Sequence, residues 1–208
     1  MTPGDILKTE MYAGIATSSR RLCGALALAA AICAPVAAAA QDGVRDLGGQ
    51  PAHPLTGTAG TAATVLIFTA VDCPISDRYA PELQRLRDAY ARRGVRFWLV
   101  YPNAGDGPAA ARAHAEVFSY AMPVVLDPRG ALVGAAKVSV TPEAAVFDAT
   151  GRLMYHGRID DRYLDFGLDR PVPTRRDLAE ALGSVIAGRR VQVSETRAVG
   201  CAIVRDQP

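Results

Sequence analysis

The chain has little net charge and no dense block of lysine and arginine. Its formal net charge is +2 at pH 7 over 208 residues, and half of those residues are hydrophobic. A protein that follows a nucleic-acid backbone needs a concentrated basic surface interleaved with aromatic side chains. The composition therefore excludes nucleic acid as the expected partner, and the length suits one domain with short extensions.

The chain also lacks a complete phosphate-binding loop. The segment PNAGDGP at residues 102–108 contains one Gly-x-Gly, but no third glycine and no Gly-Lys-Ser/Thr follow it. Asp106 within the segment would repel an anion. We therefore expect no cofactor, and the sequence predicts no metal site of its own.

Much of the apolar excess is concentrated near the N-terminus. Arg20 and Arg21 precede the run LCGALALAAAICAPVAAAA, which ends in small residues. A basic flank, an apolar core and an Ala-x-Ala exit are typical of a secretory signal peptide, so we predict that residues 1–40 are removed after Ala40. A membrane anchor is the alternative, but Pro35 breaks the run. The protein is expected in the periplasm, with membrane contact only through an uncleaved signal.

Cysteine is scarce in the mature chain. Signal removal would take away Cys23 and Cys33 and would leave Cys73 and Cys201, together with 20 basic and 19 acidic residues. Two thiols allow one disulfide at most. An oxidising periplasm would permit that disulfide.

Residues 61–190 alternate strand and helix patterns. Residues 41–60 are predicted to form an extended lead-in, and residues 191–208 a C-terminal tail that carries Cys201. Strand-type runs occupy 64–70, 95–101 and 123–127, and a hairpin is expected from 140–148 and 152–159. Helical periodicity covers 76–93, 109–120, 129–138 and 174–189.

The last of these helices has the clearest apolar stripe. Thr174 and Asp177 at its start resemble a capping pair. Just before it, Asp160 and Asp161 lie among arginines in what we expect to be a solvated loop. The stripe itself consists of Leu178, Ala181, Leu182, Val185 and Ile186.

Three segments carry a family resemblance. They are FTAVDCPIS (68–76), VTPEAAVFDATGRLMYHG (140–157) and the insert helix that precedes PVVLDP (123–128). Together they resemble the thioredoxin fold, and more closely the exported redoxins related to alkyl hydroperoxide reductases and thiol-disulfide oxidoreductases. The resemblance implies an α/β three-layer sandwich whose mixed central sheet joins a βαβ unit to a ββα unit.

The resemblance also implies roles for five residues. Cys73 matches the nucleophilic first cysteine, Pro142 the cis-proline that faces it, and Thr141 the residue whose backbone meets the partner chain. Ser76 stands where dithiol members have their second cysteine, so Cys201 is the candidate remote resolving thiol. A Cys73–Cys201 disulfide, a free tail thiol and a link to another protein all remain open.

The position of Cys73 suits thiol chemistry for physical reasons. It precedes Pro74 at the start of a helix, where unpaired N–H groups and the helix dipole favour a thiolate. The hydroxyl of Ser76 can donate to that thiolate, whereas the neighbouring Asp72 opposes a second negative charge. We therefore expect a reachable sulfur with a lowered pKa; the alternative is an inert buried thiol.

These residues predict a thiol-disulfide oxidoreductase that acts on protein or small-molecule thiols and disulfides and takes electrons from an external reductant. A thiol peroxidase is the first alternative, but Leu66 and Ala70 replace the Pro and Thr of its Pro-x-x-x-Thr-x-x-Cys motif. Copper delivery on the same fold would have to gather Cys73, Cys201 and His156. A non-catalytic binding domain is the last alternative, because Ser76 replaces a thiol.

Overall fold

The main sheet is built around strand β2 (Ala63–Phe68), an apolar, β-branched run in which every residue is buried. The structure is a computed structural model that describes residues 41–204. The predicted signal peptide at residues 1–40 lies outside the described residues. A strand that is covered on both faces has no polar side to show to solvent, which explains the continuous apolar sequence of β2.

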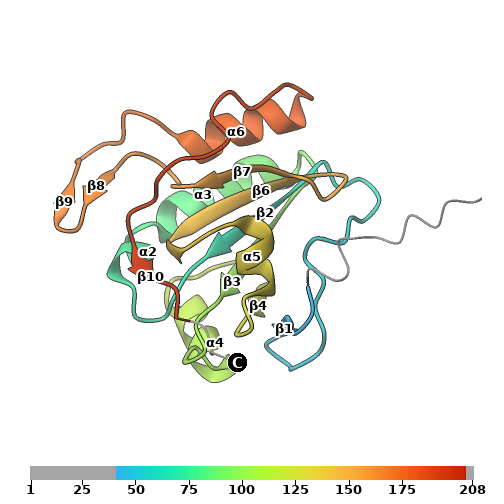
Figure 1. Ribbon diagram of the computed structural model, residues 1–208, viewed down its shortest axis with the longest axis vertical. Coiled ribbons are helices and arrows are strands. Elements are labelled where there is room, and N and C mark those ends of the chain that lie inside the picture. The colour runs from blue at the N-terminus through green and yellow to red at the C-terminus, as the bar shows by residue number, and fades with distance from the viewer. Residues whose placement is uncertain (1–40, 205–208) are drawn as a thin grey trace, which may run out of the picture. The chain divides into compact units, whose positions relative to one another are not determined.

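Within residues 41–204, six strands form the main sheet in the order β1-β4-β3-β2-β6-β7 (Figure 1). Strands β2, β3 and β4 are mutually parallel, while β1, β6 and β7 run antiparallel to their neighbours. The sheet is therefore mixed, as predicted. The bounds of the remaining strands are β1 Arg45–Asp46, β3 Val95–Tyr101, β4 Val124–Leu126, β6 Glu143–Asp148 and β7 Leu153–Gly157.

Helices cover both faces of this sheet. Along β2, Val65 and Ile67 enter one apolar cluster with residues of α3, α4 and α6, while Leu66 and Phe68 enter a second cluster with α5 and the lead-in. This alternation is the two-residue period of a strand. The three-layer α/β sandwich is confirmed. The helices are α2 Pro74–Arg78, α3 Ala80–Ala91, α4 Pro108–Val117, α5 Ala131–Ala136 and α6 Asp177–Ile186.

The helix predicted at 76–93 is two helices that meet at Tyr79, which ends α2 and begins α3. Pro81 follows within the first turn of α3. Because proline has no backbone N–H, a single continuous helix would lack the bond from residue 81 to the carbonyl of Asp77. The proline was visible in the sequence, and it marks the break.

Two predictions about the last helix and its approach are wrong. Thr174 and Asp177 do not form a capping pair, because Asp161 accepts hydrogen bonds from the backbone and hydroxyl of Thr174. Asp177 is buried and accepts a bond from Arg158 Nε at 2.7 Å. Asp160 and Asp161 are also buried rather than solvated. Buried carboxylates need such partners, and the arginines and Thr174 supply them.

The C-terminal tail folds back along the domain. It first follows the outer edge of β7, where His156 N donates to Ser194 O at 3.0 Å and Thr196 N donates to His156 O at 3.2 Å. It then forms β10 (Cys201–Ala202), which pairs with β5 (Val140–Thr141) beside α2 (Figure 1). A second small sheet is the hairpin of β8 (Tyr163–Asp165) and β9 (Leu168–Asp169).

Candidate active site

The turn between β2 and α2 positions Cys73. The residue has extended backbone angles, φ −100° and ψ 101°, and immediately precedes the helix, with Pro74 in the first helical position. The N–H of Asp77 donates to the carbonyl of Cys73 at 3.2 Å, so the helix begins against this residue. Proline costs nothing there, because an N–H in the first turn has no helical acceptor.

The cis-proline loop faces the Cys73 sulfur. The Thr141-Pro142 bond is cis, and Cys73 Sγ donates to the carbonyl oxygen of Thr141 at 3.0 Å. Thr141 is fully buried and belongs to β5, the strand that receives the tail. Thr141 and Pro142 follow Cys73 by 68 and 69 residues in sequence, and the fold brings the three together.

The tail brings the second sulfur to the same point. Cys201 lies opposite Thr141 in the antiparallel pair of β10 and β5, and its Sγ donates to Cys73 Sγ at 2.7 Å. No bond joins the two cysteines. The sequence could propose Cys201 as a partner of Cys73, and the structure places it in direct contact across 128 residues.

The sequence match agrees with this geometry. The family model described as Redoxin matches residues 35–163, which is more than half of the chain. The chain belongs to the redoxin family. No curated protein matches this redoxin in sequence.

Three solved structures are similar to this chain, and the first two share its fold. A hypothetical protein from Sinorhizobium meliloti is 23% identical, with a TM-score of 0.66 over 79% of this chain and 91% of that one. An uncharacterized conserved protein from Geobacillus kaustophilus is 25% identical, also with a TM-score of 0.66, over 79% and 88%. A secreted disulfide oxidoreductase from Mycobacterium tuberculosis is 18% identical, with a TM-score of 0.49 over 73% and 98%.

The surroundings of Cys73 favour its thiolate. Burial by itself disfavours the charge, but hydrogen bonds from Cys201 and then from Ser76 outweigh it and hold the Cys73 pKa below its ordinary value. The Ser76 oxygen is buried and has no hydrogen-bond partner of ordinary geometry within residues 41–204, so its proton is available to a Cys73 thiolate. The predicted direction of the pKa shift is confirmed.

The surroundings of Cys201 favour its protonated form. Burial, the hydrogen bond to Cys73, and the charges of Cys73, Asp72 and Asp77 raise the pKa of Cys201 to about 12. One proton shared between two adjacent sulfurs is bound more tightly than either would bind it alone. Of the two sulfurs, Cys73 therefore ionises first, and Cys201 is the thiol that donates to it.

The sequence prediction of a reachable sulfur is wrong. Cys73 is 0% exposed and belongs to the apolar cluster beneath α3, while Cys201 is only partly buried. The alternative of an inert buried thiol is right about burial, yet an inert thiol needs no acidifying hydrogen bonds. Access to Cys73 therefore requires a movement of whatever covers it.

A buried polar chain beside α2 was missed in the sequence. Tyr101 Oη is 2.7 Å from His114 Nδ1, and His114 Nε2 is 2.9 Å from Asp77 Oδ1. Both Tyr101 and His114 are buried. The available signal was the register of His114 on the helix after Pro108, between Ala111 and Ala115, which both face the core. The chain ties α4 to α2 and fixes the helix that begins at Cys73.

His156 does not join the sulfur pair. Its Nδ1 lies 3.8 Å from Glu143 and its Nε2 lies 3.7 Å from Glu195 of the tail. Within residues 41–204 no three His, Cys, Asp or Glu side chains gather in a way that could hold a metal ion. None of the helices in this part of the chain is long and apolar enough to cross a membrane.

Proposed function

We propose that this redoxin is a thiol-disulfide oxidoreductase whose redox pair is Cys73 and Cys201. The observation that carries the proposal is the 2.7 Å separation of the two sulfurs beside the Thr141 carbonyl. The backbone pairing of Cys201 with Thr141 supports the proposal, because Thr141 also contacts the Cys73 sulfur and a disulfide needs two residues whose Cα atoms lie within about 7 Å of each other. Ser76 then needs no thiol of its own, since the tail supplies one.

The first step is attack by Cys73. Its thiolate bonds to one sulfur of a substrate disulfide, the substrate S–S bond breaks, and the released thiolate takes a proton from water. During this step the Ser76 hydroxyl helps to fix the position of the attacking sulfur, because the thiolate can accept a hydrogen bond from it but can no longer donate one to the Thr141 carbonyl. The product is a mixed disulfide between Cys73 and the substrate.

The second step is resolution by Cys201. In the mixed disulfide, Cys73 carries no charge and accepts no proton, so two of the causes that raise the pKa of Cys201 disappear. Cys201 then loses its proton more readily and attacks the Cys73 sulfur, and the second substrate thiolate leaves. Two electrons have passed to the substrate, and a dithiol reductant returns them by reducing the Cys73–Cys201 disulfide.

The resting pKa values give these steps an order. While Cys73 is a thiolate, Cys201 stays protonated and does not compete for the substrate. Once Cys73 has reacted, Cys201 ionises more readily and becomes a stronger nucleophile than it is in the resting protein. We further propose that this chemistry takes place after export, in the periplasm, on protein or small-molecule disulfides, because the first 40 residues have the pattern of a signal peptide.

A single-turnover assay tests the proposal. The reduced protein is mixed with excess oxidised glutathione, and the thiol released per protein molecule is counted with a thiol reagent. We expect two thiols from the unaltered protein, one from Cys201→Ser, which stops at a mixed disulfide, and none from Cys73→Ser. Mass spectrometry would show glutathione attached to Cys73 in the Cys201→Ser variant.

Two results would contradict the proposal. The first is no thiol release from the unaltered protein, and the second is equal release by the unaltered protein and by Cys73→Ser. Consumption of hydrogen peroxide that depends on Cys73 and outpaces disulfide reduction would replace the proposal with a thiol peroxidase.

A further inference from the structure

The tail occupies an edge of β5, a strand that adjoins Cys73. Cys201 lies opposite Thr141 and Ala202 opposite Val140, and the N–H of Ile203 donates to the carbonyl of Ser139 at 3.1 Å. An extended polypeptide that adds to a strand edge uses these same backbone groups. Two strands cannot use them at once, so the tail and any such partner exclude each other.

Gly200 makes the close approach of the tail to this edge sterically feasible. A Cβ at Gly200 would overlap the carbonyl oxygen of Thr141 and lie 2.6 Å from the carbonyl carbon and 3.1 Å from Pro142 N. These are backbone atoms of the cis-proline loop, which cannot turn aside as a flexible side chain can. A strand that follows this path therefore needs glycine immediately before its cysteine.

The tail is attached lightly at this edge. Strand β10 has only two residues. Ala202, within the strand, and Val204, beyond it, are both exposed. The next contacts are Val204 N to Asn103 Oδ1 at 2.9 Å and Ala104 N to the Val204 carbonyl at 3.1 Å, in an exposed loop. Short segments with few buried contacts are those that open at the lowest free energy.

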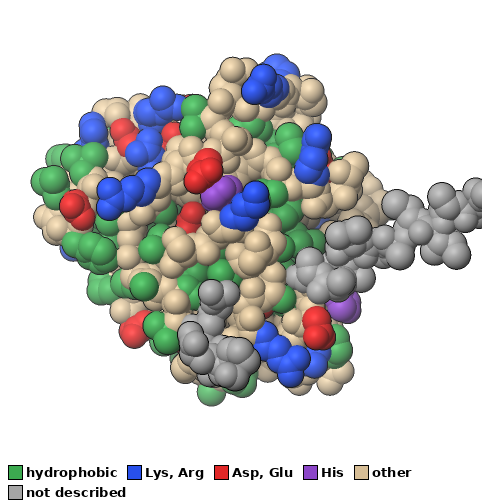
Figure 2. Space-filling model, viewed as in Figure 1, with side chains coloured by type: hydrophobic (Ala, Val, Ile, Leu, Met, Phe, Trp, Pro, Cys, Tyr) green, Lys and Arg blue, Asp and Glu red, His purple; other side chains and the backbone are tan. Residues whose placement is uncertain are grey.

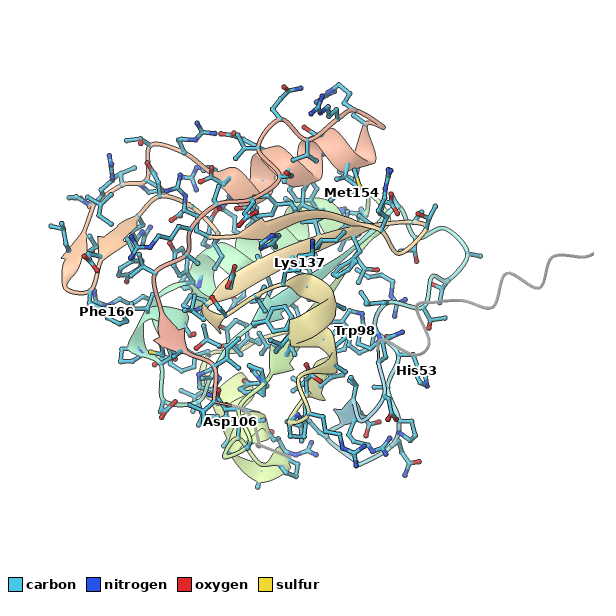
Figure 3. All side chains as sticks on the ribbon, viewed as in Figure 1. His53, Trp98, Asp106, Lys137, Met154 and Phe166 are labelled. Carbon is cyan, nitrogen blue, oxygen red and sulfur yellow. The ribbon has the colours of Figure 1, made fainter. Side chains whose placement is uncertain are left out.

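A cleft runs beside the tail. It has a volume of about 450 Å³ and is lined by Val140, Val199 and Gly200 and by Phe166 of the β8–β9 hairpin. Phe166 is 65% exposed, and Figure 3 shows it at the outer end of the hairpin. Hydrophobic side chains gather over this hairpin, at the left of Figure 2. A bound strand that is longer than β10 could therefore place its side chains in this cleft.

We propose that residues 200–203 are a displaceable internal strand, and that a polypeptide partner with a disulfide-bonded Gly-Cys segment reaches Cys73 by replacing them on β5. This inference rests on the proposed function. The partner disulfide breaks, its Gly-Cys sulfur bonds to Cys73, and its other sulfur leaves as a thiolate that water protonates. The tail then returns, and Cys201 attacks the Cys73 sulfur.

When the tail returns to β5, it completes the reaction and releases the product in the same movement. The Cys73–Cys201 bond forms as the Cys73–partner bond breaks, and the partner strand loses its place on β5 in the same movement. A dithiol reductant then restores both thiols. One segment thus covers Cys73 at rest, resolves the mixed disulfide and evicts the reduced partner.

The test is a comparison of two glycine substitutions in a Cys201→Ser background, where Cys73 is the one mature thiol. Gly200→Ala should drive the tail off β5, whereas Gly105→Ala adds a Cβ with no atom within 4 Å and is the control. Iodoacetamide reacts with Cys73 only when it is exposed, so its plateau rate at high pH follows the open population. We expect Gly200→Ala to react about tenfold faster or more, and Gly105→Ala to match the background.

Peptide disulfides test the partner side. With the Gly200→Ala variant, a peptide whose reactive cysteine follows glycine should form the mixed disulfide with Cys73 faster than the same peptide with alanine there. Equal rates for the two peptides, or equal iodoacetamide rates for Gly200→Ala and Gly105→Ala, would overturn the inference.

Hydrogen exchange on the unaltered full chain gives a measurement that needs no variant. The amides of residues 201–203 should exchange faster than those of β2, because the tail opens without unfolding the sheet. Equal protection of the two segments would contradict a displaceable tail. These outcomes are separable from the proposed function, because release of two thiols to glutathione tests only the redox pair.

Discussion

The pKa of Cys73 should depend on whether residue 201 can donate a hydrogen bond. Cys201→Ala removes the donor that lies 2.7 Å from Cys73 Sγ, whereas Cys201→Ser keeps one. A hydrogen bond to a charged group contributes about 1.5–3 kcal/mol, and a thiol is a weak donor, so the lower end applies. At about 1.4 kcal/mol per pKa unit, Cys201→Ala should raise the Cys73 pKa by about one unit.

The assay is the pH dependence of iodoacetamide alkylation, checked by the ultraviolet absorbance of the thiolate. We expect the midpoint for Cys201→Ala to lie about one pH unit above that for Cys201→Ser. Hydrogen bonds from Ser76 remain in both variants, so the midpoint for Cys201→Ala should still stay below the value it reaches when Ser76→Ala is added. Equal midpoints for the alanine and serine variants would refute the claim that the tail acidifies Cys73.

Three further predictions concern stability. Leu182→Ala, at a fully buried position of α6, should lower the free energy of unfolding by about 2–5 kcal/mol in urea titrations, and a loss under about 1 kcal/mol would count against close packing there. Gly157→Ala should lower the melting temperature, because φ is +138° and a Cβ would overlap Thr196; an unchanged temperature would mean that the tail is not seated on β7. Burial by itself would raise the pKa of Asp161, yet hydrogen bonds from Thr174 and the next residue lower it to about 2. Asp161 therefore stabilises the fold above its ordinary pKa, and this stabilisation is lost as the pH falls through about 2. Asp161→Asn should reduce the loss of stability in acid, and an unchanged dependence of stability on acid pH would contradict this.

Local sequence patterns predicted most of the fold. The continuous apolar run of β2 and the stripe on α6 each reflect burial that the residues themselves require. The position of Cys73 at the strand-to-helix turn followed from Pro74 in the same way. Such patterns depend on neighbours within a few residues, which is why they can be found in a single sequence.

The errors arose where distant residues competed for a partner. Thr174 has the sequence context of a helix cap, but its hydroxyl donates a hydrogen bond to the carboxylate of Asp161 instead. Asp160 seemed suited to solvent, but the hydroxyl of Tyr79 donates to it at 2.6 Å across 81 residues. No local pattern reports such pairings, because they exist only after the chain has folded.

The candidate site shows the same division. Family resemblance identified Cys73 and Pro142, but the register of Cys201 opposite Thr141 depends on the missing side chain at Gly200. A glycine in an irregular tail has many uses, so the sequence alone gave no reason to choose this one. The burial of Cys73 was missed for a related cause, since its apolar cluster is assembled from elements far apart in sequence and its sulfur contacts the tail.

Whether Cys73 and Cys201 form the redox pair is tested most directly by peptide mapping without reduction, after the unaltered protein has been equilibrated in glutathione buffers from reducing to oxidising. We expect one intramolecular disulfide, between Cys73 and Cys201, that forms and disappears reversibly with the buffer potential. Two free thiols at the oxidising end, or disulfides found only between protein molecules, would contradict it.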